Sequence, residues 1–216
     1  EHVFGKSGFF RSLMNSVIVV GCSCFFNCVI ASMAAYGFEK KHFWGKEFLF
    51  KVYMLTLMIP GQVTMIPVFI IMKKLGLLNT YFALVVIILN AFGVFLIRQF
   101  MESVPDELLE AAKVDGCPEY KIFINIVIPL IKPVLVSLVV FTFVTSWNDF
   151  MWPLVSTTDS SMYTLTVALS LLKTQYQTNY GLILAGATVS FIFPFILYAF
   201  LQKQFVEGIA LSGVKG

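Results

Sequence analysis

Charged residues are scarce in this sequence. Only 12% of its 216 residues are Asp, Glu, Lys or Arg, whereas soluble globular domains carry about a quarter. Hydrophobic residues make up 58% of the chain, and the mean hydropathy is +0.86. This composition excludes an ordinary soluble domain. We therefore expect an all-α integral membrane protein that crosses the bilayer several times.

Other scarcities exclude further classes of protein. The net charge is only +3 and the lysines form no basic stripe, so nucleic acid is not an expected partner. The four cysteines suggest no disulfide framework. Cys24 and Cys28 share a helix face, but no His or carboxylate lies near them in the sequence, so we expect no metal site. No Ser/His/Asp, Cys/His or zinc-type spacing indicates a catalytic residue.

The sequence also lacks a complete nucleotide-binding loop. Gly5-Lys6-Ser7 is similar to the end of a P-loop, but the first glycine of that motif would lie before residue 1 and no strand is visible, so we expect a polar linker. Charges inside the apolar runs are nearly absent, which argues against a proton-relay carrier. We expect the chain to bind no cofactor, so the energy for any transport must come from a partner.

Long apolar runs dominate what is present. About 20 residues suffice to cross a bilayer as a helix, and five runs meet this length approximately. Pro60 and Pro67 are expected to kink the second run. Residues 160–172 are too short for a span and are expected to form a re-entrant or surface helix at the outer face. The predicted spans are residues 13–36, 50–72, 77–98, 132–150 and 181–201.

A polar segment, residues 103–129, separates the third and fourth spans. It predicts a helix-turn-helix, which we call the elbow. Gly116 suits the left-handed end of the first helix. The remaining signals are a capping box at Ser103 and Asp106, Pro105 in the first turn, and Pro118 with Glu119 at the start of the second helix.

One face of the first helix of the elbow carries small side chains. Leu108, Ala111, Ala112 and Asp115 follow a spacing that places them on the same side. Two alanines there would let another surface approach the backbone closely, which favours a docking role. The alternative is a solvated loop helix whose alanines only favour helix formation.

The elbow carries a motif with a known counterpart. Glu110-Ala111-Ala112, three residues, Gly116, nine residues and Ile126-Val127-Ile128-Pro129 resembles the EAA loop of permease subunits in ABC importers. Ile128 stands where that family usually has Leu. Further segments, in order along nearly the whole chain, are similar to the carbohydrate-importing branch that includes the maltose permeases: Asn15-Ser16, Ala34-Ala35-Tyr36, Ile59-Pro60-Gly61-Gln62, Gly76-Leu77-Leu78-Asn79-Thr80, Trp147-Asn148-Asp149 and Gly213-Val214-Lys215-Gly216.

The resemblance implies a fold and partners. The fold would be the polytopic helical bundle of type I ABC importer permeases, with six spans in the full chain and five visible here. The partners would be two cytoplasmic ATPase subunits that hold ATP and Mg²⁺, a second homologous permease chain, commonly in a heterodimer, and an extracytoplasmic solute-binding protein. By motif, the ATPase-docking residues are Glu110, Ala111, Ala112 and Gly116, with Asp115 as a weaker member.

Charge distribution predicts the orientation. A cytoplasmic elbow places ten Lys and Arg residues inside and five outside, in agreement with the positive-inside rule. The C-terminus is then also cytoplasmic, in a bacterial-type cytoplasmic (inner) membrane. Five spans would leave Glu1 outside with no signal sequence, so we expect the native chain to be longer.

The resemblance around Trp147 implies a sugar, an oligosaccharide or a related polyol as cargo. Candidate path-lining residues are Gln62, Asn90, Trp147, Asn148 and Asp149. The alternatives are a packing kink near Gln62 and a boundary-marking acid at Asp149. Rival functions are an ABC permease for another solute such as a phosphorylated polyol, a stand-alone channel or secondary carrier, and, less favoured, a membrane enzyme.

Overall fold

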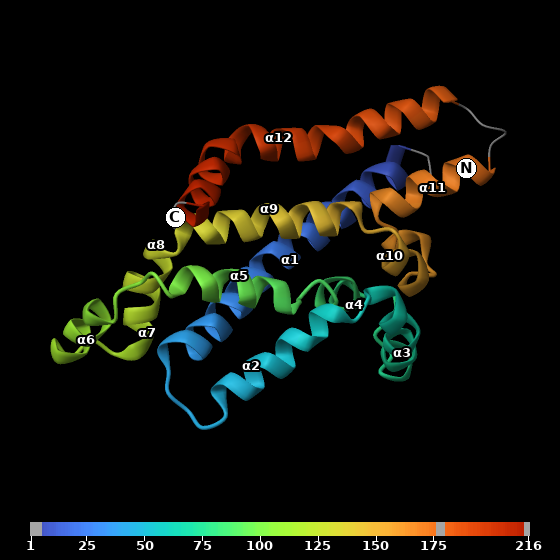
Figure 1. Cartoon of the computed structure of the whole chain (residues 1–216). Helices are drawn as coiled ribbons and strands as arrows, with labels where there is room; N and C mark the ends of the chain where they lie inside the picture. The colour runs from blue at the N-terminus through green and yellow to red at the C-terminus, as the bar shows by residue number, and fades with distance from the viewer. Residues whose placement is uncertain (1–5, 176–179, 214–216) are drawn as a thin grey trace. The chain divides into compact units, whose positions relative to one another are not determined.

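The computed structural model describes residues 6–175 and 180–213, all of whose regular elements are helices (Figure 1). The all-α expectation is confirmed for this part of the chain. Three helices, α1 (Lys6–Lys40), α9 (Lys132–Asn148) and α12 (Tyr180–Gly213), contribute residues to both of two compact units. Unit 1 comprises Glu1–Cys24, Pro60–Ile88 and Phe141–Phe200, and unit 2 comprises Phe25–Ile59, Leu89–Val140 and Leu201–Gly216.

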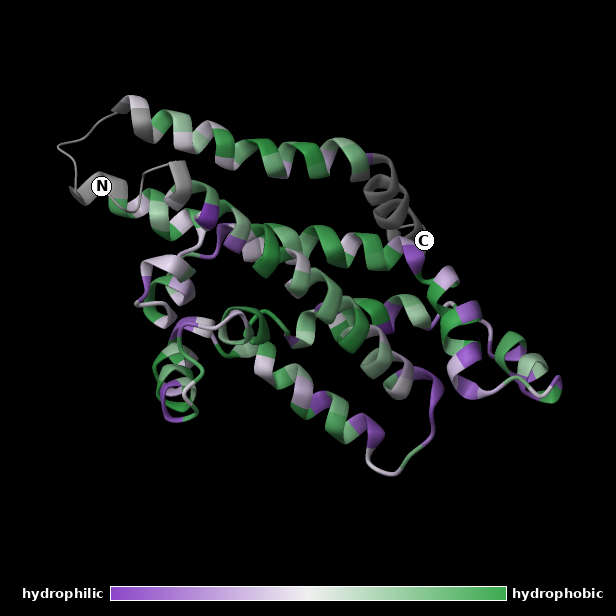
Figure 2. Ribbon diagram, turned by 180° about the vertical axis from the view of Figure 1, so that it is seen from behind, coloured by the Kyte–Doolittle hydropathy of each residue, from purple (hydrophilic) through white to green (hydrophobic). Residues whose placement is uncertain are grey.

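One helix among the described residues is by itself long and apolar enough to cross a membrane. It is the stretch Gly8–Lys40 of α1, with 33 residues. Two pairs of helices joined at a sharp bend could each supply a further span, which raises the number to three. The five predicted spans therefore stay a prediction. Hydrophilic residues gather in the connection between α1 and α2 (Lys46–Leu55) and in the short helices α6 (Asp106–Val114) and α7 (Glu119–Ile122) (Figure 2).

The second apolar run is broken rather than kinked. It forms α2 (Lys46–Leu55), the short η1 (Thr56–Met58) and α3 (Gly61–Lys74). Ile59 is extended, with φ −89° and ψ 115°, because the ring of Pro60 disfavours a helical conformation in the preceding residue. Pro67 lies inside α3.

The third apolar run is also two helices, α4 (Tyr81–Val86) and α5 (Ala91–Met101). Asn90 caps α5, because its Oδ1 accepts a hydrogen bond of 3.0 Å from the N–H of Phe92. Thr80 caps α4 in the same way, through the N–H of Ala83. The predicted span 77–98 therefore contains a helix break before Asn90, and its crossing of the membrane stays a prediction.

The core of unit 1 holds α3, α4, α10 (Met151–Ser156), η3 (Ser160–Met162) and α11 (Leu165–Gln175). Trp152 fills its centre, and its Nε1–H donates to the carbonyl of Ala83 at 2.8 Å. Leu165, Val167 and Ala168 are fully buried. Residues 160–172 thus form η3 and most of α11, and the expected re-entrant or surface helix at the outer face stays a prediction. The last helix, α12, spans Tyr180–Gly213.

Polar residues join the loops of unit 1. The amide of Asn15 donates to the carbonyls of Ser161 and Tyr163 and accepts from the hydroxyl of Tyr81. Asn79, with a left-handed φ of 59°, accepts from the N–H groups of Thr158 and Asp159. Asn15 and Asn79 belong to the segments that resemble the carbohydrate branch, and in this structure both hold loops together.

The core of unit 2 holds the second half of α1 together with α2, α5, the elbow and the first half of α9. Its most deeply buried large side chains come from α5, the elbow, α9 and the residue directly before α9. They are Ile97, Met101, Ile122, Val127, Ile131 and Leu138.

Gly93 lies where α5 passes closest to its neighbours in unit 2. A Cβ added there would lie 3.1 Å from the Cβ of Ala31 and 3.2 Å from the Cδ1 of Leu138. We expect Gly93→Val to lower the free energy of unfolding by about 1–3 kcal/mol, because inserted methyl groups overpack this crossing. Thermal unfolding in detergent measures the loss.

Gly21→Ala and Gly93→Ala form a matched pair for this prediction. Gly21 also lies inside a helix, but an added Cβ there has no neighbour within 4 Å. Gly21→Ala is expected to be neutral or stabilising, since Ala favours helix more than Gly does. Equal unfolding temperatures for the two alanine variants would contradict the close crossing at Gly93.

Candidate functional site

The elbow, residues 103–129, contains α6 (Asp106–Val114), a turn and α7 (Glu119–Ile122), and α6 and α7 contact each other (Figure 1). A π-helical turn, η2 (Phe123–Val127), and α8 (Ile128–Leu130) connect α7 to α9. The proline of the motif explains the wider turn. Pro129 has no N–H to donate, and its ring crowds the carbonyl of Asn125, four residues earlier.

The turn of the elbow is a Schellman motif. Gly116 has a φ of 76°, its N–H donates to the carbonyl of Lys113, and the N–H of Cys117 donates to the carbonyl of Ala112, both at 3.0 Å. Both bonds satisfy carbonyls at the end of α6 that would otherwise lack partners. The left-handed role of Gly116 predicted from the sequence is confirmed. Pro118, in an extended conformation, precedes α7.

The start of α6 differs from the prediction. Ser103 donates its hydroxyl to the carbonyl of Phe100 at 2.7 Å, and no side chain caps the helix. Pro105 is the N-cap residue and not part of the first turn. The predicted capping box is therefore wrong, because the carboxylate of Asp106 pairs with Lys40 instead.

The structure divides the predicted docking face of α6. Ala112 is buried together with Leu109, which is only 4% exposed, so these two residues attach α6 to the core of unit 2. Leu108 is 47% exposed and Val114 is 88% exposed. Glu110, Ala111, Asp115 and Gly116 are also exposed. Asp106, Glu107 and Lys113 are exposed on α6 as well. We call Leu108, Glu110, Ala111 and Val114 of α6, together with its C-cap Asp115, the outer face.

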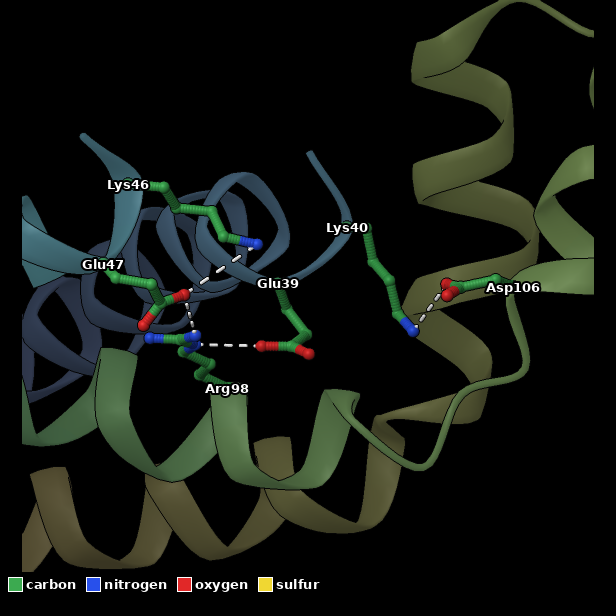
Figure 3. Close-up of polar contacts among 6 residues, drawn as sticks. All are labelled: Glu39, Lys40, Lys46, Glu47, Arg98 and Asp106. Atoms are coloured by element: carbon green, nitrogen blue, oxygen red, sulfur yellow. Dashed lines mark hydrogen bonds and ion pairs between the residues drawn. The ribbon is translucent and has the colours of Figure 1, made fainter. Parts of the chain in front are cut away.

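The N-terminal end of α6 is held by the last residue of α1. Lys40, whose side chain is 6% exposed, donates to Asp106 at 2.8 Å and to the carbonyl of Val104 at 2.6 Å (Figure 3). The hydrogen bond from Lys40 lowers the pKa of Asp106 below its ordinary value. A buried ammonium needs such partners, so this contact fixes the end of α6 against α1.

The N-terminal end of α7 is held from the same place. The carboxylate of Glu119 accepts hydrogen bonds from the ammonium of Lys41 and from the hydroxyl of Tyr36. Both bonds lower the pKa of Glu119, and the hydrogen bond from Lys41 has the larger effect. Lys41 also lies 5.0 Å from the centroid of the Tyr36 ring.

A second charged cluster joins three helices of unit 2. Arg98 of α5 donates to Glu39 of α1 and to Glu47 of α2, both at 2.9 Å (Figure 3). Its guanidinium lies 3.9 Å from the centroid of the Phe50 ring, and its side chain is 14% exposed. Sequence reasoning missed these pairs, because their members lie more than fifty residues apart.

The five predicted path residues have different surroundings. Trp147 is 5% exposed, stacks on Phe143 and donates its Nε1–H to the carbonyl of Ser190, which is a packing role. Asn148 is exposed and donates to the carbonyl of Val144 at 2.8 Å. Asp149 is half-buried, and its carbonyl accepts from the hydroxyl of Thr166. Gln62 and Asn90 are exposed.

The part of the chain that the structure describes shows no group of three or more His, Cys, Asp or Glu residues that could hold a metal ion. Cys22, Cys24, Cys28 and Cys117 are free thiols. The site is therefore one of helix surfaces and ion pairs.

Comparisons with known proteins add the family. The model of the family described as binding-protein-dependent transport system inner membrane component matches residues 28–210. The arabinooligosaccharides transport system permease protein AraQ of Halalkalibacterium halodurans is 37% identical over 221 residues, covering 100% of this chain and 78% of the relative. The lactose transport system permease protein LacG of Rhizobium radiobacter is 35% identical over 202 residues, covering 93% and 74%.

A solved structure shares the fold. It is the crystal structure of a bacterial ABC transporter involved in the import of the acidic polysaccharide alginate, with a TM-score of 0.72 and 23% identity, covering 99% of this chain and 77% of that chain. The family match, the relatives and the elbow motif agree. The chain belongs to the family of binding-protein-dependent transport system inner membrane components, the permease subunits of ABC transporters.

Proposed function

We propose that this chain is the membrane-spanning subunit of an ATP-driven importer and that the outer face of α6 docks a cytoplasmic ATPase. The observation that carries this proposal is an exposed apolar surface on a helix that is held firmly. Leu108 and Val114 are exposed on α6, while Leu109 and Ala112 attach the same helix to the core of unit 2. Exposed apolar groups on an attached helix suit a protein partner.

The outer face has the chemistry of a docking surface. Ala111 is small, which lets a partner approach the backbone of α6. Leu108 and Val114 flank it and can fill an apolar cleft, while Glu110 and Asp115 supply acidic groups at the edge. Gly116 ends the helix at a fixed point, so the face keeps one length and direction.

In the proposed cycle two ATPase subunits, holding ATP and Mg²⁺, close on nucleotide binding and move the elbow. The chain itself has no complete P-loop, so it supplies movement and not hydrolysis. Each conformation must be stabilised by contacts that differ between the states. Three sources supply those contacts. They are the closure of the ATPases, a second homologous permease chain that forms a heterodimer with this one, and an extracytoplasmic binding protein that delivers the cargo.

The proposed topology has the five spans expected from the sequence, with the elbow and the C-terminus in the cytoplasm of a bacterial-type cell. The ten-to-five distribution of Lys and Arg supports this orientation. The attachment of the elbow to the end of α1 at Lys40 also supports it, because that end then lies on the cytoplasmic side as well.

The proposed cargo is a sugar, an oligosaccharide or a related polyol. Relatives named for arabinooligosaccharides and lactose support this class. Gln62, Asn90 and Asn148 present exposed amide groups that suit hydroxyl-rich molecules, with Asp149 as an acceptor. Because Trp147 is buried, we expect it to support the path residues by packing and not to contact the cargo.

Uptake in the native host tests this function. Radiolabelled arabinotriose and lactose are offered to cells with the gene intact, deleted or restored, alongside a phosphorylated polyol. We expect uptake of at least one sugar to need both this chain and cellular ATP. Uptake of the phosphorylated polyol alone would favour the other-solute permease, and transport that survives removal of every associated ATPase would favour a self-sufficient carrier.

The path residues are tested in the same assay with Gln62→Ala, Asn90→Ser and Asn148→Ala. Serine can still cap α5 at position 90, so that variant removes the amide while keeping the helix start. A raised KM without loss of the protein from the membrane is expected. Unchanged uptake in the triple variant would remove these residues from the path.

A further inference from the structure

The two helices of the elbow begin in the same way. Asp106 is the first residue of α6 and Glu119 is the first residue of α7. Their carboxylates are held by two consecutive lysines, Lys40 at the end of α1 and Lys41 directly after it. An acidic residue in the first turn of a helix is favourable by itself, because it interacts with the helix dipole. The helix dipole does not explain why Asp106 and Glu119 both contact the end of α1.

Two attachment points restrict the elbow more than one would. A single contact lets a helix pair rotate about it, whereas contacts at the start of α6 and the start of α7 fix the direction of the outer face. Tyr36 adds a third constraint, because its hydroxyl donates to Glu119 and its ring lies 5.2 Å from the ring of Phe123 in η2. Tyr36 and Lys40 are both buried.

We propose that Tyr36, Lys40 and Lys41 are positioning residues that fix the elbow to α1, and that α1 is the helix through which movement of a docked ATPase enters the membrane. This inference rests on the proposed docking of the ATPase at α6. Its reason is continuity: α1 is one helix from Lys6 to Lys40 and is long enough to cross the bilayer. A displacement imposed on α6 is therefore passed to the end of a spanning helix.

The Lys41–Glu119 pair is the suitable place for a test. Both side chains are partly exposed, so reversing the charges there buries no new ion. The variants are Lys41→Glu, Glu119→Lys and the double exchange, which restores an ion pair with opposite polarity. In the double exchange Tyr36 can turn its hydroxyl to accept from Lys. Lys121→Glu is the control, since it makes the same charge change on an exposed residue of α7.

Two readouts on the full chain, purified in mild detergent with its bound partners, separate the possibilities. Hydrogen exchange reports the attachment, because the N–H groups of Lys121 and Ile122 bond to the carbonyl of Pro118 at the start of α7. We expect both single variants to exchange faster by up to about fivefold in residues 103–122, the factor that corresponds to a partly exposed ion pair. Residues 25–35 of α1 should exchange as in the wild type.

The second readout is the amount of P-loop ATPase that copurifies. The single variants should retain less ATPase. The charge-swapped double variant should restore both the wild-type hydrogen-exchange rate and ATPase retention, and Lys121→Glu should change neither. Single variants with wild-type exchange, or a double exchange as impaired as the single ones, would overturn the attachment while leaving ATPase docking intact. If the wild type retains no ATPase after crosslinking, the proposed function fails, and the exchange data alone decide on the attachment.

Discussion

Gly116→Pro is expected to abolish capture of the ATPase while leaving the chain in the membrane. Gly116 has a φ of 76°, and proline is restricted to a φ near −65°. The substitution also removes the N–H that bonds to the carbonyl of Lys113. The end of α6 and the direction of the outer face are then lost together. A pull-down in mild detergent, with mass spectrometry of the bound ATPase, measures the effect.

A graded series separates backbone conformation from bulk at this position. An added Cβ at Gly116 has no neighbour within 4 Å, so only the positive φ opposes a side chain there. Gly116→Asn should retain most of the ATPase and Gly116→Val should retain little, because Asn tolerates the left-handed conformation and β-branched residues do not.

Gly45 supplies the matched control. It has a φ of 78°, an added Cβ there also has no neighbour within 4 Å, and it lies in the α1–α2 connection. Gly45→Val should therefore strain the backbone to a similar extent without loss of the ATPase. Equal loss at the two positions would mean that general destabilisation, and not the shape of the elbow, controls docking.

Arg98→Met is expected to lower the free energy of unfolding by about 1–3 kcal/mol, because it leaves the partly buried carboxylate of Glu39 without its hydrogen-bond donor. Arg98 joins α5 to Glu39 of α1 and to Glu47 of α2. Methionine preserves much of the packing against Phe50 but leaves the carboxylate of Glu39 without its ion-pair partner. Thermal unfolding in detergent and the amount of protein in the membrane measure the loss.

Two further variants test the cause of that loss. Arg98→Lys keeps the charge but lacks the planar guanidinium that reaches two carboxylates, so an intermediate stability is expected. Adding Glu39→Gln to Arg98→Met removes the unpaired charge and should recover part of the stability. If Arg98→Met unfolds at the wild-type temperature, the ion pairs of Arg98 do not contribute to stability and the expected effect is contradicted.

The parts of the fold that the sequence predicted well depend on neighbouring residues. Gly116 and Pro118 mark the turn of the elbow because left-handed backbone and a helix start are local requirements. The break at Asn90 was not predicted, although Asn is a preferred N-cap residue. Counting uncharged residues hid it, because a cap within an apolar run carries no charge.

The parts that the sequence did not predict depend on distant residues. Ser103 and Asp106 have the spacing of a capping box, but Lys40, 66 residues away from Asp106, takes that carboxylate. Ala112 has the spacing of an outer-face residue, but the core of unit 2 buries it. Neither outcome follows from local spacing, since each is decided by which helix packs against the elbow.

Photo-crosslinking from Leu108 tests the central claim most directly. A benzophenone amino acid replaces Leu108 on the outer face, and a second variant carries it at Phe48, an exposed position on α2. We predict that illumination of native membranes links position 108 to a P-loop ATPase and that position 48 does not reach it. An ATPase that crosslinks at position 48 but not at position 108, or no protein partner at position 108, would contradict docking at the elbow.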